Sequence, residues 1–307
     1  MTNRTKAAAR ATQPGDPAAV ADRAARLRGF FARYVATKGG AKDPRIERAF
    51  AAVPREPFAG AGPWQIRVPD GPYIPTPDDD PAYLYQDWLV ALDVARGINI
   101  GEAGLHARCL DALALRDGEE VLHVGAGAGY YTAVIAHLVG PSGRVHAFEI
   151  DADLAERARR NLAHLPEVEV HARSGIGDGL PRADAVYVNA SAVGPSWSWL
   201  DVLRTGGRLM FPLHAPGGYG AMLRVTRPPH GPAWPATFVS TAGFIACEGL
   251  QDQTAGRRLA AAFAGGGWQE VRSLRTDDAP DGTCRFAGEG WWLSTEAADN
   301  GTIRVRR

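Results

Sequence analysis

A glycine-rich turn between an apolar run and a helical run constrains this chain more than any other feature. The pattern of Val121 to Val124 predicts a buried strand, and that of Tyr130 to Val139 predicts a helix. Between them stands Gly125-Ala126-Gly127-Ala128-Gly129. In Rossmann-like folds this order builds a nucleotide site, because glycines let the backbone approach the ligand and the helix offers free N–H groups. The turn therefore predicts one strand-turn-helix unit of a parallel sheet.

The segments that follow continue to alternate between strand and helix patterns. We expect further strands at residues 145–148, 168–171, 185–188 and 208–211. A second helix is expected at residues 152–165, and the turn Gly206-Gly207 is expected to lead into the last strand. This alternation predicts an α/β fold with a Rossmann-like, doubly wound and mostly parallel sheet.

The patterns outside this core predict additions at both ends. Asp16-Pro17 resembles a helix start, residues 54–82 are rich in proline, and a further helix is expected at 104–115. Beyond residue 213 the pattern becomes antiparallel-like. We therefore divide the chain into a flexible tail (1–15), an N-terminal helical and loop region (16–118), a cofactor-binding core (119–250) and a C-terminal extension without an assigned role (251–307).

The composition excludes several classes of function. Lys+Arg and Asp+Glu both number 34, and this zero net charge argues against nucleic acid as a partner. Cys109, Cys247 and Cys284 lack the CxxC spacing, so neither a disulfide framework nor a metal site is predicted. No apolar run approaches the about 18 residues of a membrane span. A cytoplasmic protein is expected, and its oligomeric state is open.

An acidic residue after the second strand supports the nucleotide site. Glu149 stands 20 positions after Gly129, at the end of the strand expected at 145–148, where an acid accepts the ribose hydroxyls. The G-x-G-x-G spacing differs from the G-x-G-x-x-G of dinucleotide sites and favours S-adenosylmethionine, which has no phosphate to bind. The predicted cofactor-binding residues are Gly125, Ala126, Gly127, Gly129, Glu149, Ile150, Ser174 and Gly175.

Four stretches in one order resemble protein-L-isoaspartate O-methyltransferases, and the chain is identified as a divergent member of that family. They are residues 45–58 (RIERAFAAVPREPF), 99–107 (NIGEAGLHA), 121–133 (VLHVGAGAGYYTA) and 203–209 (LRTGGRL). The resemblance implies a methyltransferase Rossmann domain with extra terminal elements. It also implies that the α-carboxylate of an isoaspartyl residue in a damaged protein is esterified with the methyl group of S-adenosylmethionine.

Two positions depart from the pattern of that family. The serine that lies next to the transferred methyl group in the family falls on Gly101, which has no hydroxyl. The acidic residue that holds the adenine amino group falls on Ser174-Gly175, with Gly177-Asp178-Gly179 as an alternative register. The first departure concerns the methyl acceptor, and the second concerns the cofactor.

No residue is assigned a catalytic role from the sequence, because a carboxylate with a pKa of about 4 is already ionised and needs no base. The catalytic candidates are Asn99, Gly101 and His106. Glu102, which would accept from an amine or a hydroxyl, and Asn189, which ends the fourth core strand, are candidate substrate contacts.

Several functions stay open at this point. The leading hypothesis is a carboxyl O-methyltransferase that acts on aspartyl or isoaspartyl residues of a protein or peptide. Gly101 and the C-terminal extension also suggest a specialised relative that esterifies the precursor peptide of a ribosomal natural product. A small-molecule methyltransferase would use Glu102 or His106 as a base. A non-catalytic cofactor-binding protein is the last alternative.

Overall fold

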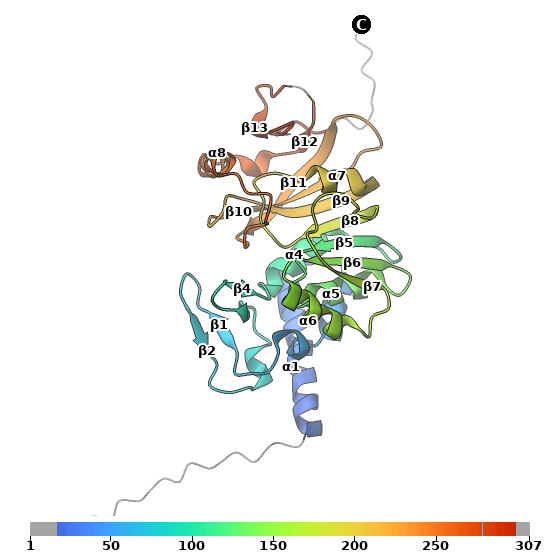
Figure 1. Cartoon of the computed structure of the whole chain (residues 1–307), viewed down its shortest axis with the longest axis vertical. Helices are drawn as coiled ribbons and strands as arrows, with labels where there is room; N and C mark the ends of the chain where they lie inside the picture. Colours follow the sequence, from blue (N-terminus) through green and yellow to red (C-terminus); the bar gives the residue numbers. More distant parts are fainter. Residues whose placement is uncertain (1–16, 278, 299–307) are drawn as a thin grey trace, which may run out of the picture.

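The computed structural model describes residues 17–277 and 279–298, so the tail predicted at 1–15 lies outside the described residues. One ten-stranded sheet forms the centre of the molecule (Figure 1). In spatial order its strands are β13 (Cys284–Gly288), β14 (Trp291–Ser294), β12 (Ser273–Arg275), β11 (Ala233–Ala242), β10 (Gly220–Thr226), β9 (Leu203–Leu213), β8 (Ala183–Val188), β5 (Glu120–Val124), β6 (Arg144–Glu149) and β7 (Val168–Ala172).

The sheet consists of a parallel half and an antiparallel half. Strands β7, β6, β5, β8 and β9 run parallel to one another, and β10 starts an antiparallel series that continues through β11, β12, β14 and β13. The strands of the parallel half are the five that the sequence predicts. Because β5 lies between β6 and β8, the strand order reverses beside the glycine-rich turn, where open α/β sheets bind ligands.

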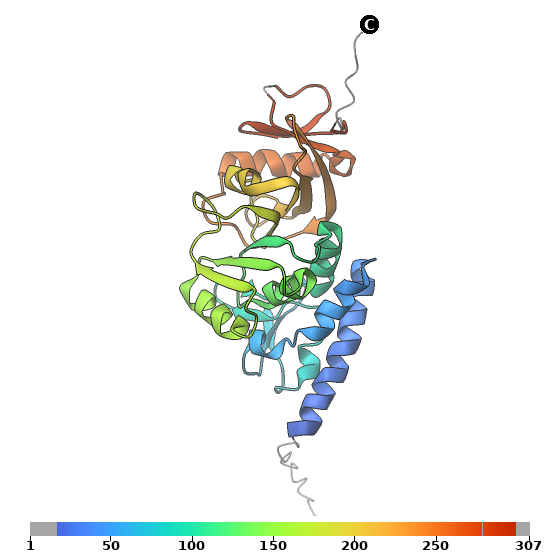
Figure 2. The ribbon, with the colours of Figure 1, turned by 90° about the vertical axis from the view of Figure 1, so that its right-hand side faces the viewer.

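Helices cover both faces of the sheet. Val121 and Val145 point into one core, and Leu122 and Phe148 point into the other, because side chains alternate along a strand. The first core includes residues of α1 (Pro17–Gly39), α2 (Pro44–Ala52), α4 (Ala103–Leu113), α5 (Tyr130–Val139) and α6 (Ala152–Leu162). The second includes residues of α7 (Trp197–Val202) and α8 (Gln253–Ala264). Figure 2 shows α1 as a long helix along one side of the molecule.

The proline-rich stretch at 54–82 has more regular structure than the sequence suggests. It contains α3 (Glu56–Ala59), a hairpin of β1 (Gln65–Arg67) and β2 (Tyr73–Pro75), and the 3-10 helix η1 (Pro81–Tyr83). The backbone N–H of Trp64 donates to Thr76 Oγ1 at 2.9 Å, and both residues are buried. A second hairpin, β3 (Ala91–Asp93) with β4 (Ile98–Asn99), follows. Figure 1 places β1, β2 and β4 beside the main sheet, near its parallel half.

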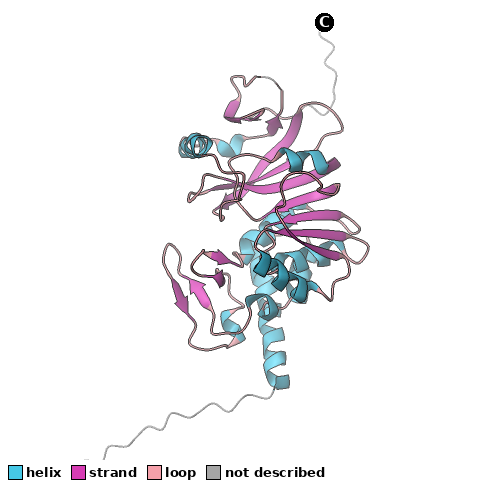
Figure 3. Cartoon of the chain, viewed as in Figure 1, coloured by secondary structure: helices cyan, strands magenta, loops and turns pink. Residues whose placement is uncertain are grey.

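The residues after position 250 extend the same sheet. Helix α8 and the 3-10 helix η2 (Trp268–Glu270) precede β12, and β14 pairs with both β12 and β13. Trp291 and Trp292 in β14 are buried. The strands, magenta in Figure 3, follow one another from the parallel half of the sheet to its C-terminal strands. None of the helices within residues 17–277 and 279–298 is both long and apolar enough to cross a membrane.

Strand β9 is longer than predicted because it includes the Gly206-Gly207 turn as an irregularity. Its pairing with β8 jumps from Ala183 opposite Leu203 to Ala185 opposite Arg208. Gly206 has a φ of 77°, a left-handed conformation that favours glycine. The extra residues at this point bring the Arg208 side chain into the core.

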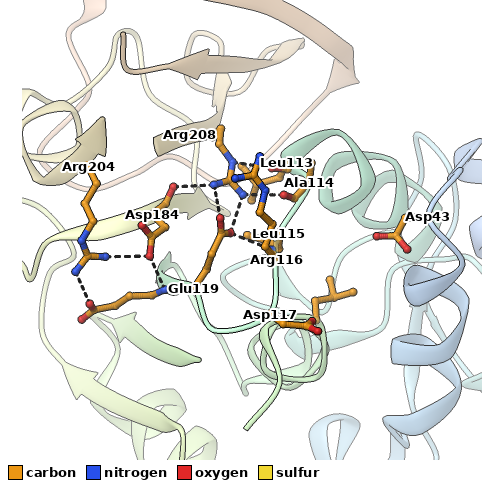
Figure 4. Close-up of polar contacts among 12 residues, drawn as sticks. Asp43, Leu113, Ala114, Leu115, Arg116, Asp117, Glu119, Asp184, Arg204 and Arg208 are labelled. Atoms are coloured by element: carbon orange, nitrogen blue, oxygen red, sulfur yellow. Dashed lines mark hydrogen bonds and ion pairs between the residues drawn. The ribbon is translucent and has the colours of Figure 1, made fainter. Parts of the chain in front are cut away.

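A buried ion pair joins β9 to the start of β5 (Figure 4). Arg208 Nη1 and Nη2 donate to the two carboxylate oxygens of Glu119 at 2.8 and 2.7 Å. The same guanidinium donates to the carbonyl oxygens of Leu113 (3.0 Å) and Ala114 (2.8 Å) at the end of α4. Burial is the largest single effect and raises the pKa of Glu119, but the hydrogen bonds from Arg208 and the Arg116 backbone, together with the charges of both arginines, leave this pKa below its ordinary value. Arg208 therefore holds α4, β5 and β9 together.

We predict that Arg208→Ala lowers the free energy of unfolding by about 3–5 kcal/mol, because it leaves the Glu119 carboxylate buried without its partner. Arg204→Ala is the matched control. Arg204 lies four residues earlier on β9 and pairs with Glu120 and Asp184, but 40% of its side chain is exposed. Its loss is expected to cost about 0–1 kcal/mol. Denaturant unfolding of both variants measures the difference, and equal losses would contradict the role given to Arg208.

Candidate functional site

The glycine-rich turn folds tightly at the carboxyl end of β5. Gly125, Gly127 and Gly129 have φ values of 76°, 56° and 96°, which non-glycine residues rarely adopt. The backbone N–H groups of Gly125 and Ala126 donate to the carbonyl oxygen of Phe148 on β6, at 2.9 and 3.1 Å. The turn is therefore fixed to the end of the neighbouring strand, with the start of α5 directly after it.

Gly129 also permits close packing between the turn and α6. A β-carbon at this position would lie 2.7 Å from Leu162 Cδ1, which is shorter than real contacts. The amide of Asn161, one residue earlier on α6, donates to the carbonyl oxygen of Ala128 at 2.9 Å. The third glycine of the motif thus serves helix packing, and the first two serve the turn.

Glu149 at the end of β6 faces the turn. Its Oε2 accepts from the Gly127 backbone N–H at 2.7 Å, and its Oε1 accepts from the Asp151 backbone N–H at 3.0 Å. A carboxylate has about four acceptor positions, so each oxygen retains capacity for a ligand hydroxyl. The next residue, Ile150, is 52% exposed and offers an apolar surface beside the carboxylate. A carboxylate acceptor beside an apolar surface fits the ribose and adenine of S-adenosylmethionine.

The loop after β7 closes the same end of the sheet. The Ser174 hydroxyl accepts from the Ile176 backbone N–H at 3.2 Å, and Trp199 Nε1 donates to the carbonyl oxygen of Gly175 at 2.8 Å. A β-carbon at Gly175 would lie 2.8 Å from the Val124 side chain, so Gly175 packs against the end of β5. Asp178, the residue of the alternative register, is exposed. The Ser174-Gly175 register thus lies at the cofactor edge of the sheet.

Asn189 follows β8 and lies beside the turn, with its carbonyl carbon 3.4 Å from the position of a β-carbon on Gly125. Its Nδ2 donates to His123 Nε2 at 2.8 Å, and the other ring nitrogen of His123 contacts Thr132 Oγ1 at 2.8 Å. Burial lowers the pKa of His123 to about 3, so this ring is neutral and accepts from the amide. Asn189 Oδ1 is then left buried without a hydrogen-bond partner among the described residues. This oxygen therefore retains the capacity to accept a further hydrogen bond.

His106 lies on α4, close to Gly101. Its ring stacks on Tyr131 with a centroid distance of 3.5 Å, and its Nδ1 lies 2.7 Å from the hydroxyl of Tyr187. Its Nε2 would lie 2.7 Å from a β-carbon on Gly101, so it faces that residue. Burial, together with the nearby His123 and the Arg55 guanidinium, lowers the pKa of His106 well below its ordinary value. His106 is thus a neutral imidazole.

Gly101 itself is held by its neighbours. It has a φ of 82°, its N–H donates to Asn99 Oδ1 at 2.9 Å, and its carbonyl oxygen accepts from the Tyr131 hydroxyl at 3.2 Å. The Asn99 Nδ2 donates to the carbonyl oxygen of Gly97 at 3.0 Å. Asn99 therefore shapes this loop with both ends of its amide.

Glu102 points to α1. Its carboxylate lies 2.7 Å from Lys38 Nζ, which also pairs with the buried Asp87 at 2.8 Å. The hydrogen bonds that Lys38 donates to these two carboxylates raise its pKa. Glu102 stands at the N-cap position of α4, where a negative charge is favoured by the helix dipole.

Two segments that the sequence does not indicate also reach the site. The β3–β4 hairpin crosses the turn, with Leu92 Cδ1 3.6 Å from the position of a β-carbon on Gly127. Arg96 of the same hairpin forms an ion pair with Asp151, the residue that caps α6. Phe244 contacts the His106 ring edge-to-face, with a centroid distance of 5.9 Å. These contacts join segments far apart in the chain, so no local pattern predicts them.

Comparisons with known proteins agree on one family. The model of the family described as Protein-L-isoaspartate(D-aspartate) O-methyltransferase (PCMT) matches residues 31–232, which is more than half of the chain. The chain belongs to this family. The prediction of a divergent protein-L-isoaspartate O-methyltransferase relative is thereby confirmed, as is that of an S-adenosylmethionine-dependent methyltransferase.

Among its relatives, the protein-L-isoaspartate O-methyltransferase of Methylorubrum extorquens is 36% identical over 221 residues, which cover 70% of this chain and 86% of the relative. The enzyme of Ignicoccus hospitalis that carries the same name is 32% identical over 203 residues, with 65% and 87% covered. Both relatives are thus covered over most of their length.

Solved structures show the same fold. A protein-L-isoaspartate O-methyltransferase aligns with a TM-score of 0.59 at 22% identity and covers 78% of this chain and 69% of its own. A Plasmodium falciparum relative in complex with S-adenosyl-L-homocysteine aligns with a TM-score of 0.57 at 18% identity, covering 72% and 98%. The predicted α/β Rossmann-like methyltransferase fold with N-terminal helices is confirmed.

We predict that Glu149→Gln weakens binding of S-adenosylmethionine by about 10- to 150-fold, equivalent to about 1.5–3 kcal/mol for hydrogen bonds to a charged group. Glu156→Gln is the matched control, because Glu156 is an exposed carboxylate on the adjoining helix α6. Calorimetric titration of both variants with the cofactor measures the effect. Equal affinities for the two variants would show that Glu149 does not contact the cofactor.

Proposed function

We propose that this chain transfers the methyl group of S-adenosylmethionine to the carboxylate of an isoaspartyl residue in a protein or peptide. Family membership supports the acceptor class, since the relatives are named for this reaction. The observation that carries the proposal is the set of neutral side chains around Gly101, because it suits an acceptor that arrives already ionised.

Among the residues that the structure describes, the titratable side chains around Gly101 offer no base at neutral pH. His106 has a lowered pKa and its Nδ1 is engaged by Tyr187. Burial raises the pKa of both Tyr131 and Tyr187 well above the ordinary value, so both phenols stay protonated. Glu102 pairs with Lys38. A hydroxyl or amine acceptor needs a base, whereas a carboxylate with a pKa of about 4 needs none.

The protein's part in this reaction is to hold two reactants in line. When bound, S-adenosylmethionine supplies a methyl group on a sulfonium: a carboxylate oxygen would bond to the methyl carbon as the carbon–sulfur bond breaks, and S-adenosylhomocysteine would leave. Glu149 would accept the ribose hydroxyls, Ile150 and Ser174 would border the adenine, and Asn189 Oδ1 would accept from the ammonium of the methionine portion. Such alignment contributes up to about 7–11 kcal/mol to lowering a barrier.

His106 would orient the acceptor. In this proposal the Tyr187 hydroxyl donates to His106 Nδ1, so Nε2 carries the ring proton and faces Gly101. Because residue 101 has no side chain, the acceptor carboxylate approaches Nε2 past Gly101 and accepts a hydrogen bond from it. In this proposal His106 contacts the acceptor in place of the serine that the family has at the position of Gly101.

Two peptides that differ in one linkage test the proposal. The purified chain and labelled S-adenosylmethionine are incubated with an isoaspartyl peptide and with the same peptide containing ordinary aspartate. We expect a base-labile methyl ester on the isoaspartyl peptide and at least ten-fold less label on the control, because an inserted methylene shifts the carboxylate out of line.

Each other outcome points to an alternative function. Label on the aspartyl peptide alone would contradict isoaspartyl selectivity and favour a dedicated peptide substrate. Methylation of small molecules alone, with loss of activity below about pH 6, would favour a base-assisted reaction at His106 or Glu102. Cofactor binding by calorimetry without turnover on any of these substrates would contradict the enzyme assignment for this acceptor.

The partner and the location belong to the same proposal. A protein or peptide is the expected partner, and nucleic acid is not, since the chain carries no net charge. The cytoplasm is the expected compartment.

A further inference from the structure

Two neighbouring strands bring three metal-ligating side chains together on the face of the sheet opposite Val145 and Ala147. His146 lies on β6, and Glu169 and His171 lie on β7. His146 is paired with Glu169, and Phe148 with His171, in the parallel register of these strands. Because side chains alternate along a strand, all three potential ligands point to the same face. They form a cluster in which each residue offers one ligand atom.

The spacing of the three ligand atoms suits a tetrahedral ion. His146 Nδ1 lies 3.3 Å from His171 Nε2 and 3.6 Å from one Glu169 oxygen. The other Glu169 oxygen lies 3.8 Å from His171 Nε2. Zn–N and Zn–O bonds of about 2.0–2.1 Å at tetrahedral angles separate ligand atoms by about 3.3–3.5 Å. The two Glu169 distances involve different oxygens, and one ligand atom from each of the three residues lies within 4.8 Å of the other two. A rotation of the exposed Glu169 carboxylate, with small shifts of the two rings, would therefore bring three atoms to bonding distance of one ion.

The Glu120 carboxylate contacts the His146 ring nitrogen that faces away from the other two potential ligands. His146 Nε2 lies 3.0 Å from a carboxylate oxygen of Glu120, whose other oxygen pairs with Arg204 at 2.7 Å. A ring N–H that donates to a carboxylate leaves the other nitrogen as a lone pair, and this arrangement recurs behind zinc-binding histidines. Here that free lone pair belongs to Nδ1, the atom that faces His171 and Glu169.

The cluster is buried on the side of His146 and exposed to solvent on the side of Glu169. The exposed fractions of the side chains rise from 9% for His146 to 21% for His171 and 55% for Glu169. The His171 ring is held against Phe148, with a centroid distance of 4.6 Å and an interplanar angle of 17°. Solvent thus borders the cluster on the side of Glu169, where a fourth coordination position would lie.

We propose that His146, Glu169 and His171 bind a divalent transition-metal ion, with Zn²⁺ as the best fit and water as the fourth ligand. Zn²⁺ accepts two imidazole nitrogens and one carboxylate oxygen as donors, whereas Mg²⁺ disfavours the two imidazoles. The ion crosslinks β7, the last strand of the sheet, to β6. The sequence predicts no metal site because its cysteines lack the CxxC spacing. That argument does not consider histidines and acids on neighbouring strands. Glu149 points to the opposite face of β6, so the metal site and the cofactor site are separate.

Calorimetric titration of the chelator-treated, tag-free chain with ZnCl₂ tests this proposal. We expect one ion per chain and a higher Tm with Zn²⁺ than without. MgCl₂ is expected to give no binding heat. His171→Ala is expected to raise the Kd for Zn²⁺ by at least about ten-fold, because it removes a ligand.

His230→Ala is the matched control, since His230 is exposed on the loop between β10 and β11. It is expected to bind Zn²⁺ like the unaltered chain. Glu169→Gln provides a second variant at an exposed position, which is expected to fold and to bind more weakly. Binding of S-adenosylmethionine serves as the folding check for every variant. No binding of Zn²⁺ by the unaltered chain, or equal affinity in His171→Ala and His230→Ala, would overturn the proposal.

Discussion

The hydrogen bond from the Gly127 backbone N–H to the Glu149 carboxylate organises the cofactor end of this molecule. It joins the turn after β5 to the end of β6, and the second oxygen of the same carboxylate accepts from Asp151 at the start of α6. The turn can approach Glu149 because its glycines adopt left-handed conformations. The parallel sheet then places the ends of β7 and β8 beside this pair, which brings Ser174 and Asn189 to the same edge.

Much of the parallel half of the fold is predictable from the sequence, and the reason is physical. Strands buried on both faces are nearly continuous apolar runs, as in Ala185 to Val188 and in Val121 to Val124, where His123 is the exception. Their boundaries fall within two residues of the predicted ones. Helix α5 begins and ends as predicted, between the glycine-rich turn and Gly140. The hairpin β1–β2 and the bulge in β9 escape prediction, because contacts such as Trp64 with Thr76 stabilise them from a distance in the chain.

The candidate site is likewise predictable from the sequence only in part. Sequence reasoning selects the segment 99–106 but does not give the partners that decide what its side chains do. Lys38 on α1 engages Glu102, and Tyr131 and Tyr187 contact the His106 ring. Burial in this packing keeps that ring neutral. These partners come from separate helices and strands, so only the packed fold shows that this segment lacks a base. The structure thereby favours a carboxylate over a hydroxyl acceptor, a choice that the sequence leaves open.

The dependence of the methyl-transfer rate on pH tests this account most directly. With a carboxylate acceptor and no base, kcat/KM is expected to stay constant from about pH 6 to pH 9 and to fall only as the acceptor is protonated, near pH 4. The lowered pKa of His106 supports this expectation, because its ring stays neutral throughout that range. A rate that falls ten-fold per pH unit below about pH 6.5, with this dependence abolished in His106→Gln, would contradict the account and identify His106 as a base.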